Sequence, residues 1–283
     1  FKLPEAKSRV SWLNSDTLLV GTDFGVDSMT TSGYPRVIKK WIRGQDLAKA
    51  PTLLTADKNH VSAWAYREYG VGGEYVFFSK NITFYTSEFY VATVSQPEQI
   101  LQLPIPMDAE VEGVFKDQLL LSLRSDWEAA GAKFSSGDVV SFDLKDFLNR
   151  KKLSSVIKVF SPKSNQALQS VSVGLGGVYF ELLSDVVGEV WHYDFDGKMW
   201  SSRKISMPRN GSVSMISVDK TSLFYMANFE NFILPTQLYW GSGAQKPQVI
   251  KKLPARFNAK GLSVRQYFAK SADGTKVPYF LVG

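Results

Sequence analysis

The sequence predicts an all-β protein built from repeated four-stranded units. Much of the 283-residue chain falls into short runs of β-branched and aromatic residues, such as Tyr75 to Thr86 and Val171 to Leu183, separated by turn residues. Amphipathic helical spacing is confined to two short segments, Gly44 to Ala50 and Leu144 to Lys152. A weak repeat of about 50 residues groups the strands into units.

Each unit has an apolar strand at a corresponding place. These strands are Thr17 to Val20, Tyr75 to Phe78, Gln118 to Leu121, Gly177 to Phe180 and Ser222 to Tyr225. Between the strands lie pairs that favour tight turns, because glycine can take the positive φ that such turns require. These pairs include Asp196-Gly197, Asn210-Gly211, Asp273-Gly274 and Ser136-Gly137. The pattern is that of a meander.

Four strands in a unit of ~40–50 residues is typical of a β-propeller blade. We therefore expect a β-propeller of about five four-stranded blades, with a β-sandwich as the alternative. The expected blades are residues 8–57, 58–109, 110–163, 164–209 and 210–256. The pattern then changes to a hairpin over Leu262 to Val282, which begins another domain.

Composition limits the chemistry that the chain can do. Absence of cysteine excludes disulfides, thiolate metal sites and a cysteine nucleophile, and the two histidines, His60 and His192, are too few for the usual zinc sites, so we expect no metal and no cofactor. The net charge is +6, but the basic groups are short, as in Arg150-Lys151-Lys152, and predict no nucleic-acid partner. No apolar run reaches the ~18 residues of a membrane span.

A serine hydrolase needs a nucleophile on a sharp Gly-x-Ser-x-Gly turn and a histidine base. The chain has no such pentapeptide, and Gly241-Ser242-Gly243 is better interpreted as a simple turn. His60 is expected in a loop between blades, and His192 is expected to pack within a strand. We therefore predict that the catalytic Ser, Asp and His of a hydrolase are absent from this chain.

Two segments resemble the prolyl oligopeptidase family of serine peptidases. The first runs from Ser11-Trp12-Leu13 through Asp16 to Gly25 and continues through Ser32-Gly33-Tyr34-Pro35-Arg36 to Trp41-Ile42-Arg43-Gly44. The second runs from Leu253-Pro254-Ala255-Arg256-Phe257 to Ser271 through Val282. Arg124-Ser125-Asp126-Trp127 is also similar to a propeller segment of bacterial members.

The resemblance implies a seven-bladed propeller in the parent protein, capping an α/β-hydrolase domain that cleaves short peptides after proline. On this basis residues 1–257 are the later blades of the propeller, and residues 258–283 begin the catalytic α/β-hydrolase domain. Both chain ends are then expected to be cut, and the Ser-Asp-His triad is expected downstream. The parent would be a serine-type oligopeptidase or endopeptidase, whereas this fragment alone would not be an enzyme.

The function that we expect is a non-catalytic cap that gates access of short proline-containing peptides to the hydrolase domain. Candidate substrate-channel residues are Arg36 and Arg43 for a peptide carboxylate, Arg124 for orientation and Trp127 for an apolar side chain, each with a packing or inter-blade role as the alternative. The expected partners are the hydrolase domain of the same chain and short peptides, with self-association through open sheet edges. A stand-alone peptide- or protein-binding propeller is the alternative function. The compartment stays open between the cytoplasm and periplasm of a bacterium.

Overall fold

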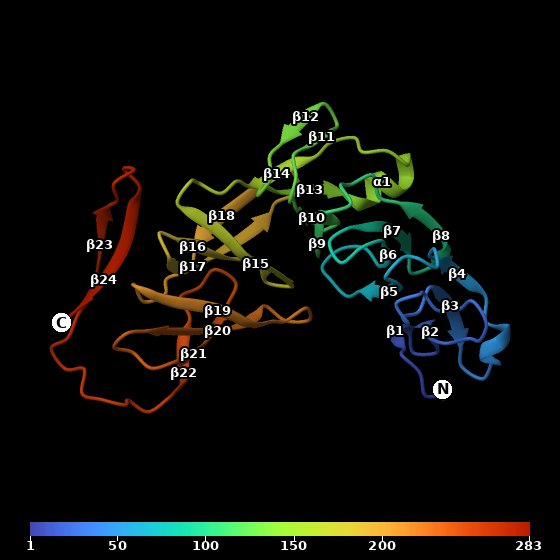
Figure 1. Cartoon of the computed structure of the whole chain (residues 1–283), viewed down its shortest axis with the longest axis horizontal. Coiled ribbons are helices and arrows are strands. Elements are labelled where there is room, and N and C mark those ends of the chain that lie inside the picture. The colour runs from blue at the N-terminus through green and yellow to red at the C-terminus, as the bar shows by residue number, and fades with distance from the viewer. The chain divides into compact units, whose positions relative to one another are not determined.

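The computed structural model describes residues 1–283, and nearly all of its regular structure is β-strand (Figure 1). Five four-stranded sheets follow one another along the chain, and two further pairs of strands form hairpins. Within each large sheet the spatial order of the strands follows the chain order, with the β11–β12 hairpin inserted between β10 and β13 of the third sheet. The prediction of an all-β protein with about five four-stranded units is confirmed.

The strand bounds show how regular the repeat is. The first sheet consists of β1 (Arg9–Asn14), β2 (Thr17–Gly21), β3 (Val37–Ile42) and β4 (Thr52–Thr55). The second consists of β5 (Ser62–Glu68), β6 (Tyr75–Asn81), β7 (Ser87–Thr93) and β8 (Gln96–Gln102). The third consists of β9 (Glu110–Phe115), β10 (Gln118–Ser122), β13 (Val139–Asp143) and β14 (Ile157–Phe160). The last two consist of β15 (Gln166–Gly174), β16 (Gly177–Ser184), β17 (Val187–Phe195) and β18 (Trp200–Lys204); and β19 (Gly211–Val218), β20 (Phe224–Asn231), β21 (Gln237–Ser242) and β22 (Gln248–Lys252). The hairpins are β11 (Trp127–Ala129) with β12 (Ala132–Phe134), and β23 (Val264–Lys270) with β24 (Lys276–Val282).

The second strand of each of the first three sheets lies in the core. Every residue of β2 is buried, as are the first five residues of β6 and the first four of β10. These strands are covered on both faces, which is why they read as continuous apolar runs rather than as alternating polar and apolar residues. Burial of each large side chain, such as Phe77 or Phe78, stabilises the fold by about 1.5–3 kcal/mol.

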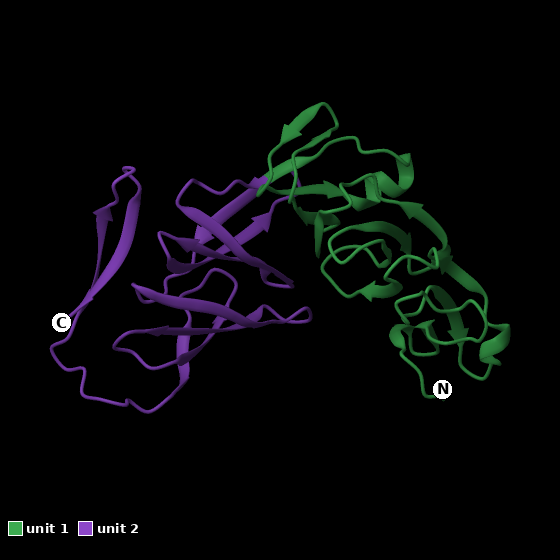
Figure 2. Cartoon of the chain, in the orientation of Figure 1, with its two compact units in different colours: residues 1–158 green, residues 159–283 purple.

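The chain divides into two compact units, residues 1–158 and residues 159–283 (Figure 2). In unit 1, one apolar cluster around Val76 and Phe78 joins the first two sheets, and another around Phe77 and Phe142 joins the second to the third. In unit 2, a cluster around Tyr179 joins the fourth and fifth sheets. Neighbouring sheets within a unit are therefore held together by side chains on their facing surfaces.

The sheets of unit 1 place their first strands side by side in the same direction. The Arg67 guanidinium of β5 donates to the Leu13 carbonyl of β1 at 2.7 Å, and Val71, just beyond β5, forms a parallel bridge with Phe115 of β9. We call the end at which β1, β5 and β9 begin the leading end of unit 1. The connections at that end are residues 22–36, 56–61, 82–86, 103–109 and 123–138.

Unit 2 has the same arrangement, because the Leu175 amide just beyond β15 donates to the Asp219 carbonyl just beyond β19 at 3.0 Å. The C-terminal hairpin contacts the end of the fifth sheet at which β19 begins, where the Asn210 side chain donates to the Val264 carbonyl at 2.8 Å. Strands β23 and β24 pair only with each other. The hairpin therefore does not extend an open sheet edge of its own chain.

Of the two segments with helical spacing, one forms a helix. Leu144 to Lys152 contains helix α1 (Leu144–Arg150), which Asp143 caps by accepting from the Asp146 amide at 2.8 Å. Gly44 to Ala50, in contrast, contains only the single 3₁₀ turn η1 (Leu47–Lys49). Ala50 precedes a proline and is extended, with φ −61° and ψ 131°, and this ends the turn. The predicted turn at Asn210-Gly211 does not join two strands of one sheet. It leads from the fourth sheet into β19 of the fifth.

Candidate functional site

Three of the four predicted substrate-channel residues lie at the leading end of unit 1. Arg36 immediately precedes β3, Arg124 follows β10 and Trp127 begins β11. Arg43 follows β3 at the opposite end of the first sheet, beside the turn between β1 and β2. The fold therefore places Arg36, Arg124 and Trp127 on one end of the unit and excludes Arg43 from it.

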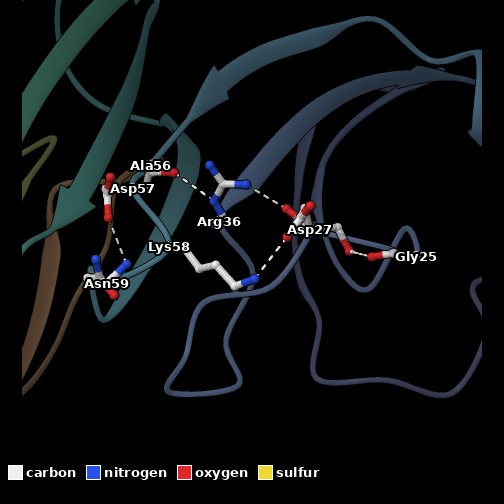
Figure 3. A network of polar contacts seen from close by, with 8 residues as sticks. Gly25, Asp27, Arg36, Ala56, Asp57, Lys58 and Asn59 are labelled. Atoms are coloured by element: carbon white, nitrogen blue, oxygen red, sulfur yellow. Dashed lines mark hydrogen bonds and ion pairs between the residues drawn. The ribbon is translucent and has the colours of Figure 1, made fainter.

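Arg36 joins two connections of the leading end (Figure 3). Its Nε donates to the Ala56 carbonyl at 2.8 Å, and its Nη1 donates to the Asp27 carbonyl at 2.6 Å. The Asp27 carboxylate lies 2.9 Å from the Lys58 ammonium, which holds the pKa of Asp27 below its ordinary value. Arg36 thus fastens the β2–β3 connection to the chain that enters the second sheet.

Arg43 is also engaged within its own sheet. Its Nε lies 3.0 Å from the Asp16 carboxylate, and its Nη2 donates to the Ser15 carbonyl at 2.9 Å. The guanidinium stands 4.8 Å from the centre of the Phe1 ring, a cation–π arrangement. The hydrogen bond from Arg43 keeps the pKa of Asp16 below its ordinary value.

Arg124 lines a cavity of about 490 Å³ at the leading end of unit 1. The cavity lies between β5 of the second sheet and the start of β9 of the third. Its aromatic wall is formed by Trp64, Tyr66, Phe84, Tyr85 and Phe89. A cavity of this size, lined by aromatic side chains and a few polar groups, is typical of a small-ligand site.

Three carboxylates share the other wall with Arg124. Glu110 forms an ion pair with the Arg124 guanidinium, Asp108 accepts from Ser125 at 2.9 Å, and Glu112 accepts from Ser122 at 2.5 Å. Burial raises the pKa of Glu112 above its ordinary value. Because three carboxylates face one guanidinium, the cavity wall carries an excess of negative charge.

Trp127 does not line this cavity. Its ring lies 6.0 Å from the ring of Phe134, across the β11–β12 hairpin, and packs half-buried against the apolar cluster of the second and third sheets. The geometry supports a packing role for this side chain.

The two histidines lie in separate units, and each has its own surroundings. His60 lies in the connection between β4 and β5, whereas His192 lies in β17 with its Nε2 2.7 Å from the Gly176 carbonyl. Ser242 ends β21. No group of three or more histidine, aspartate or glutamate side chains is arranged to hold a metal ion, and no helix is long and apolar enough to cross a membrane.

The sequence did not reveal the cavity because its walls come from separate sheets. The alternation Trp64-Ala65-Tyr66 is a strand signal that places two aromatic rings on one face. Glu110 and Glu112 lie more than 40 residues further along the chain, in β9, where the register with β10 shifts. Only the parallel alignment of β5 and β9 brings these pairs together.

Comparison with known proteins gives a consistent result. The sequence model of the family described as "Prolyl oligopeptidase, N-terminal beta-propeller domain" matches residues 2–251. An uncharacterized peptidase of Sinorhizobium fredii is 33% identical over 287 aligned positions, which cover 100% of this chain and 40% of that protein. A prolyl endopeptidase of Elizabethkingia meningoseptica is 27% identical over 150 positions, covering 50% of this chain and 21% of the relative.

The solved structures agree. A post-proline cleaving enzyme from Rickettsia typhi matches with a TM-score of 0.81 at 25% identity, over 97% of this chain and 40% of that one. An oligopeptidase B from Trypanosoma brucei matches in fold alone, with a TM-score of 0.64 at 16% identity, over 97% of this chain and 38% of that one. This chain thus spans about 40% of the length of the Sinorhizobium fredii peptidase and about 40% of the length of the Rickettsia typhi enzyme. It belongs to the prolyl oligopeptidase family and consists mainly of that family's N-terminal β-propeller domain.

Proposed function

We propose that this chain is the propeller cap of a longer serine peptidase and gates the access of short proline-containing peptides to a hydrolase domain. Family membership supports the proposal, as does the share of about 40% that the chain covers in its relatives. The mechanism is steric, since a narrow passage admits flexible peptides and excludes folded proteins. The hydrolase domain, rather than the cap, supplies the groups that break the peptide bond.

The observation that carries the proposal is the two-faced C-terminal hairpin. One face contacts the fourth and fifth sheets, where the Gln266 side chain donates to the Asp185 carbonyl at 2.5 Å and the Phe280 ring lies 5.4 Å from that of Phe232. Successive side chains of a strand point to opposite faces. The other face of the hairpin therefore carries Tyr267, which pairs with Tyr279.

That second face exposes a cluster of apolar side chains beside Arg265. The rings of Tyr267 and Tyr279 stack at 5.8 Å and are 39% and 48% exposed, and Leu281 beside them is 57% exposed. Clustered exposed apolar side chains mark an interaction surface. We assign this face to the hydrolase domain, with residues 1–257 as propeller and residues 258–283 as the start of that domain.

Among the predicted substrate-channel residues, Arg124 has the strongest support, because it lines the aromatic cavity. The intramolecular contacts of Arg36, Arg43 and Trp127 support structural roles for those three side chains. Contact of any of the four with a peptide remains a prediction.

Size selection tests the proposal directly. The longer protein from the same reading frame is incubated with a Gly-Pro peptide of about ten residues, and with a disulfide-bonded protein that carries the same sequence in a loop. We expect cleavage of the peptide and of the reduced, unfolded protein, and no cleavage of the folded protein. Equal cleavage of the folded and reduced forms would rule out a gating cap, and cleavage of none of the three would favour a stand-alone binding propeller.

A further inference from the structure

The cavity between β5 and β9 has the features of a site for a cationic group. It holds about 490 Å³ and opens toward solvent beside Phe84 and Tyr85, which are 84% and 87% exposed at the tip of the β6–β7 connection. Trp64 and Tyr66, both half-buried, form another part of the wall, and their rings lie 5.3 Å apart. The volume suits the end of a peptide rather than a folded partner.

The charge of the wall selects the sign of the ligand. Asp108, Glu110 and Glu112 face a single cation, Arg124, which is already paired with Glu110. Each carboxylate has two oxygens with about four acceptor positions, and the hydrogen bonds described above use only part of that capacity. An anionic ligand would be repelled, whereas a cation would relieve the mutual repulsion of the carboxylates.

The aromatic wall favours the same ligand class. Indole and phenol rings attract a cation placed over their faces, and the attraction grows when the site is shielded from water. The Trp64 ring already takes part in one such arrangement, because the Arg9 guanidinium lies 5.7 Å from the ring centre. Burial raises the pKa of Glu112, and a positive neighbour would favour its charged form.

We propose that this cavity binds the primary ammonium group of a peptide, with the carboxylates of Glu110 and Glu112 as acceptors and Trp64 and Tyr66 as the aromatic wall. The ammonium can come from the peptide N-terminus or from a lysine side chain. The identification of the ligand as a peptide rests on the proposed function, whereas the preference for a primary ammonium rests on the cavity alone. Such a site would hold one end of a peptide at the leading end of unit 1.

The test measures binding to the 283-residue chain by calorimetry, with three forms of one proline-containing peptide. The first has a free N-terminus, the second is N-acetylated, and the third is N-acetylated with a lysine at its first position. We expect the free peptide to bind about tenfold more tightly than the acetylated one, a factor equivalent to about 1.4 kcal/mol. Tight binding by the third form as well would extend the site to side-chain ammonium groups.

Matched variants tie the binding to the cavity. Glu112→Gln keeps the shape of the side chain and should abolish the preference for the free N-terminus. Glu110→Gln, at a more exposed position, serves as a second variant should the first unfold, and Glu128→Gln, which lies outside the cavity on β11, should leave the preference unchanged.

Equal affinity for the free and acetylated peptides would overturn the inference, as would a preference that survives both Glu112→Gln and Glu110→Gln. Neither result bears on size selection by the longer protein, so failure of this inference is distinguishable from failure of the proposed function.

Discussion

Arg36 is predicted to act as a structural tie, and replacing it with alanine measures that role. The variant Arg36→Ala removes two hydrogen bonds from a charged donor, to the carbonyls of Ala56 and Asp27. Ala56 is only 1% exposed, so its carbonyl is left with an unmet acceptor in a buried setting. Bonds of this kind are worth about 1.5–3 kcal/mol each when buried.

The hydrogen bond from Arg36 to the Asp27 carbonyl is exposed to solvent, so it contributes less to the free energy of unfolding than a buried bond does. We therefore expect Arg36→Ala to lower the free energy of unfolding of unit 1 by about 2 kcal/mol, once solvent competition for the exposed bond is allowed for. For a domain of this size the melting temperature should fall by about 4–8 °C. Urea and thermal unfolding followed by circular dichroism measure both quantities.

Arg43→Ala is the matched control. Its ion pair with Asp16 is exposed on both sides, at 52% and 67%, and such pairs are worth less than about 1 kcal/mol. If Arg36→Ala destabilised the chain no more than Arg43→Ala, the tie would be refuted. A raised KM for peptides in the longer protein, without a loss of stability, would instead make Arg36 a substrate-contacting residue.

Three further predictions concern single side chains. Tyr225→Phe removes a buried hydroxyl that has no hydrogen-bond partner, and burial raises the pKa of Tyr225 to about 12. The free energy of unfolding in urea should therefore stay unchanged or rise by up to about 1 kcal/mol, and a decrease of more than about 1 kcal/mol would contradict the absence of a partner. Gly177→Ala should lower the melting temperature, because φ is +134° and the added Cβ would lie 2.2 Å from Nε2 of His192; an unchanged melting temperature would contradict that geometry. Hydrogen bonds from Thr221 and Ser222 lower the pKa of Asp219 to about 2. The ionised carboxylate therefore contributes its full share to the free energy of unfolding above pH 3.8, the ordinary pKa, and loses that share as the pH falls through 2. An NMR titration midpoint near 3.8 would refute this.

The sequence predicted the strands that lie deepest in the core. Leu18-Leu19-Val20 and Leu119-Leu120-Leu121 are continuous apolar runs because neighbouring structure covers both faces of β2 and β10. Helix α1 was predicted from the helical spacing of Leu144 to Lys152, and two residues of that segment, Leu144 and Phe147, are buried. These signals are local, and local spacing is sufficient to detect them.

The remainder depends on contacts between distant parts of the chain. The β11–β12 hairpin was missed because its strands, Trp127–Ala129 and Ala132–Phe134, are too short to show a period. The cavity was missed for a different reason: Trp64 and Glu112 meet only because β5 and β9 run parallel in adjacent sheets. No spacing within one strand contains that information.

We expect this chain to act as a cap without peptidase activity of its own. The most direct measurement is hydrolysis of a chromogenic Gly-Pro peptide by the 283-residue chain and by the longer protein from the same reading frame, side by side. We predict activity in the longer protein alone. Hydrolysis by the isolated chain would contradict the assignment of catalysis to another domain, and activity in neither would contradict the claim that the propeller serves a peptidase.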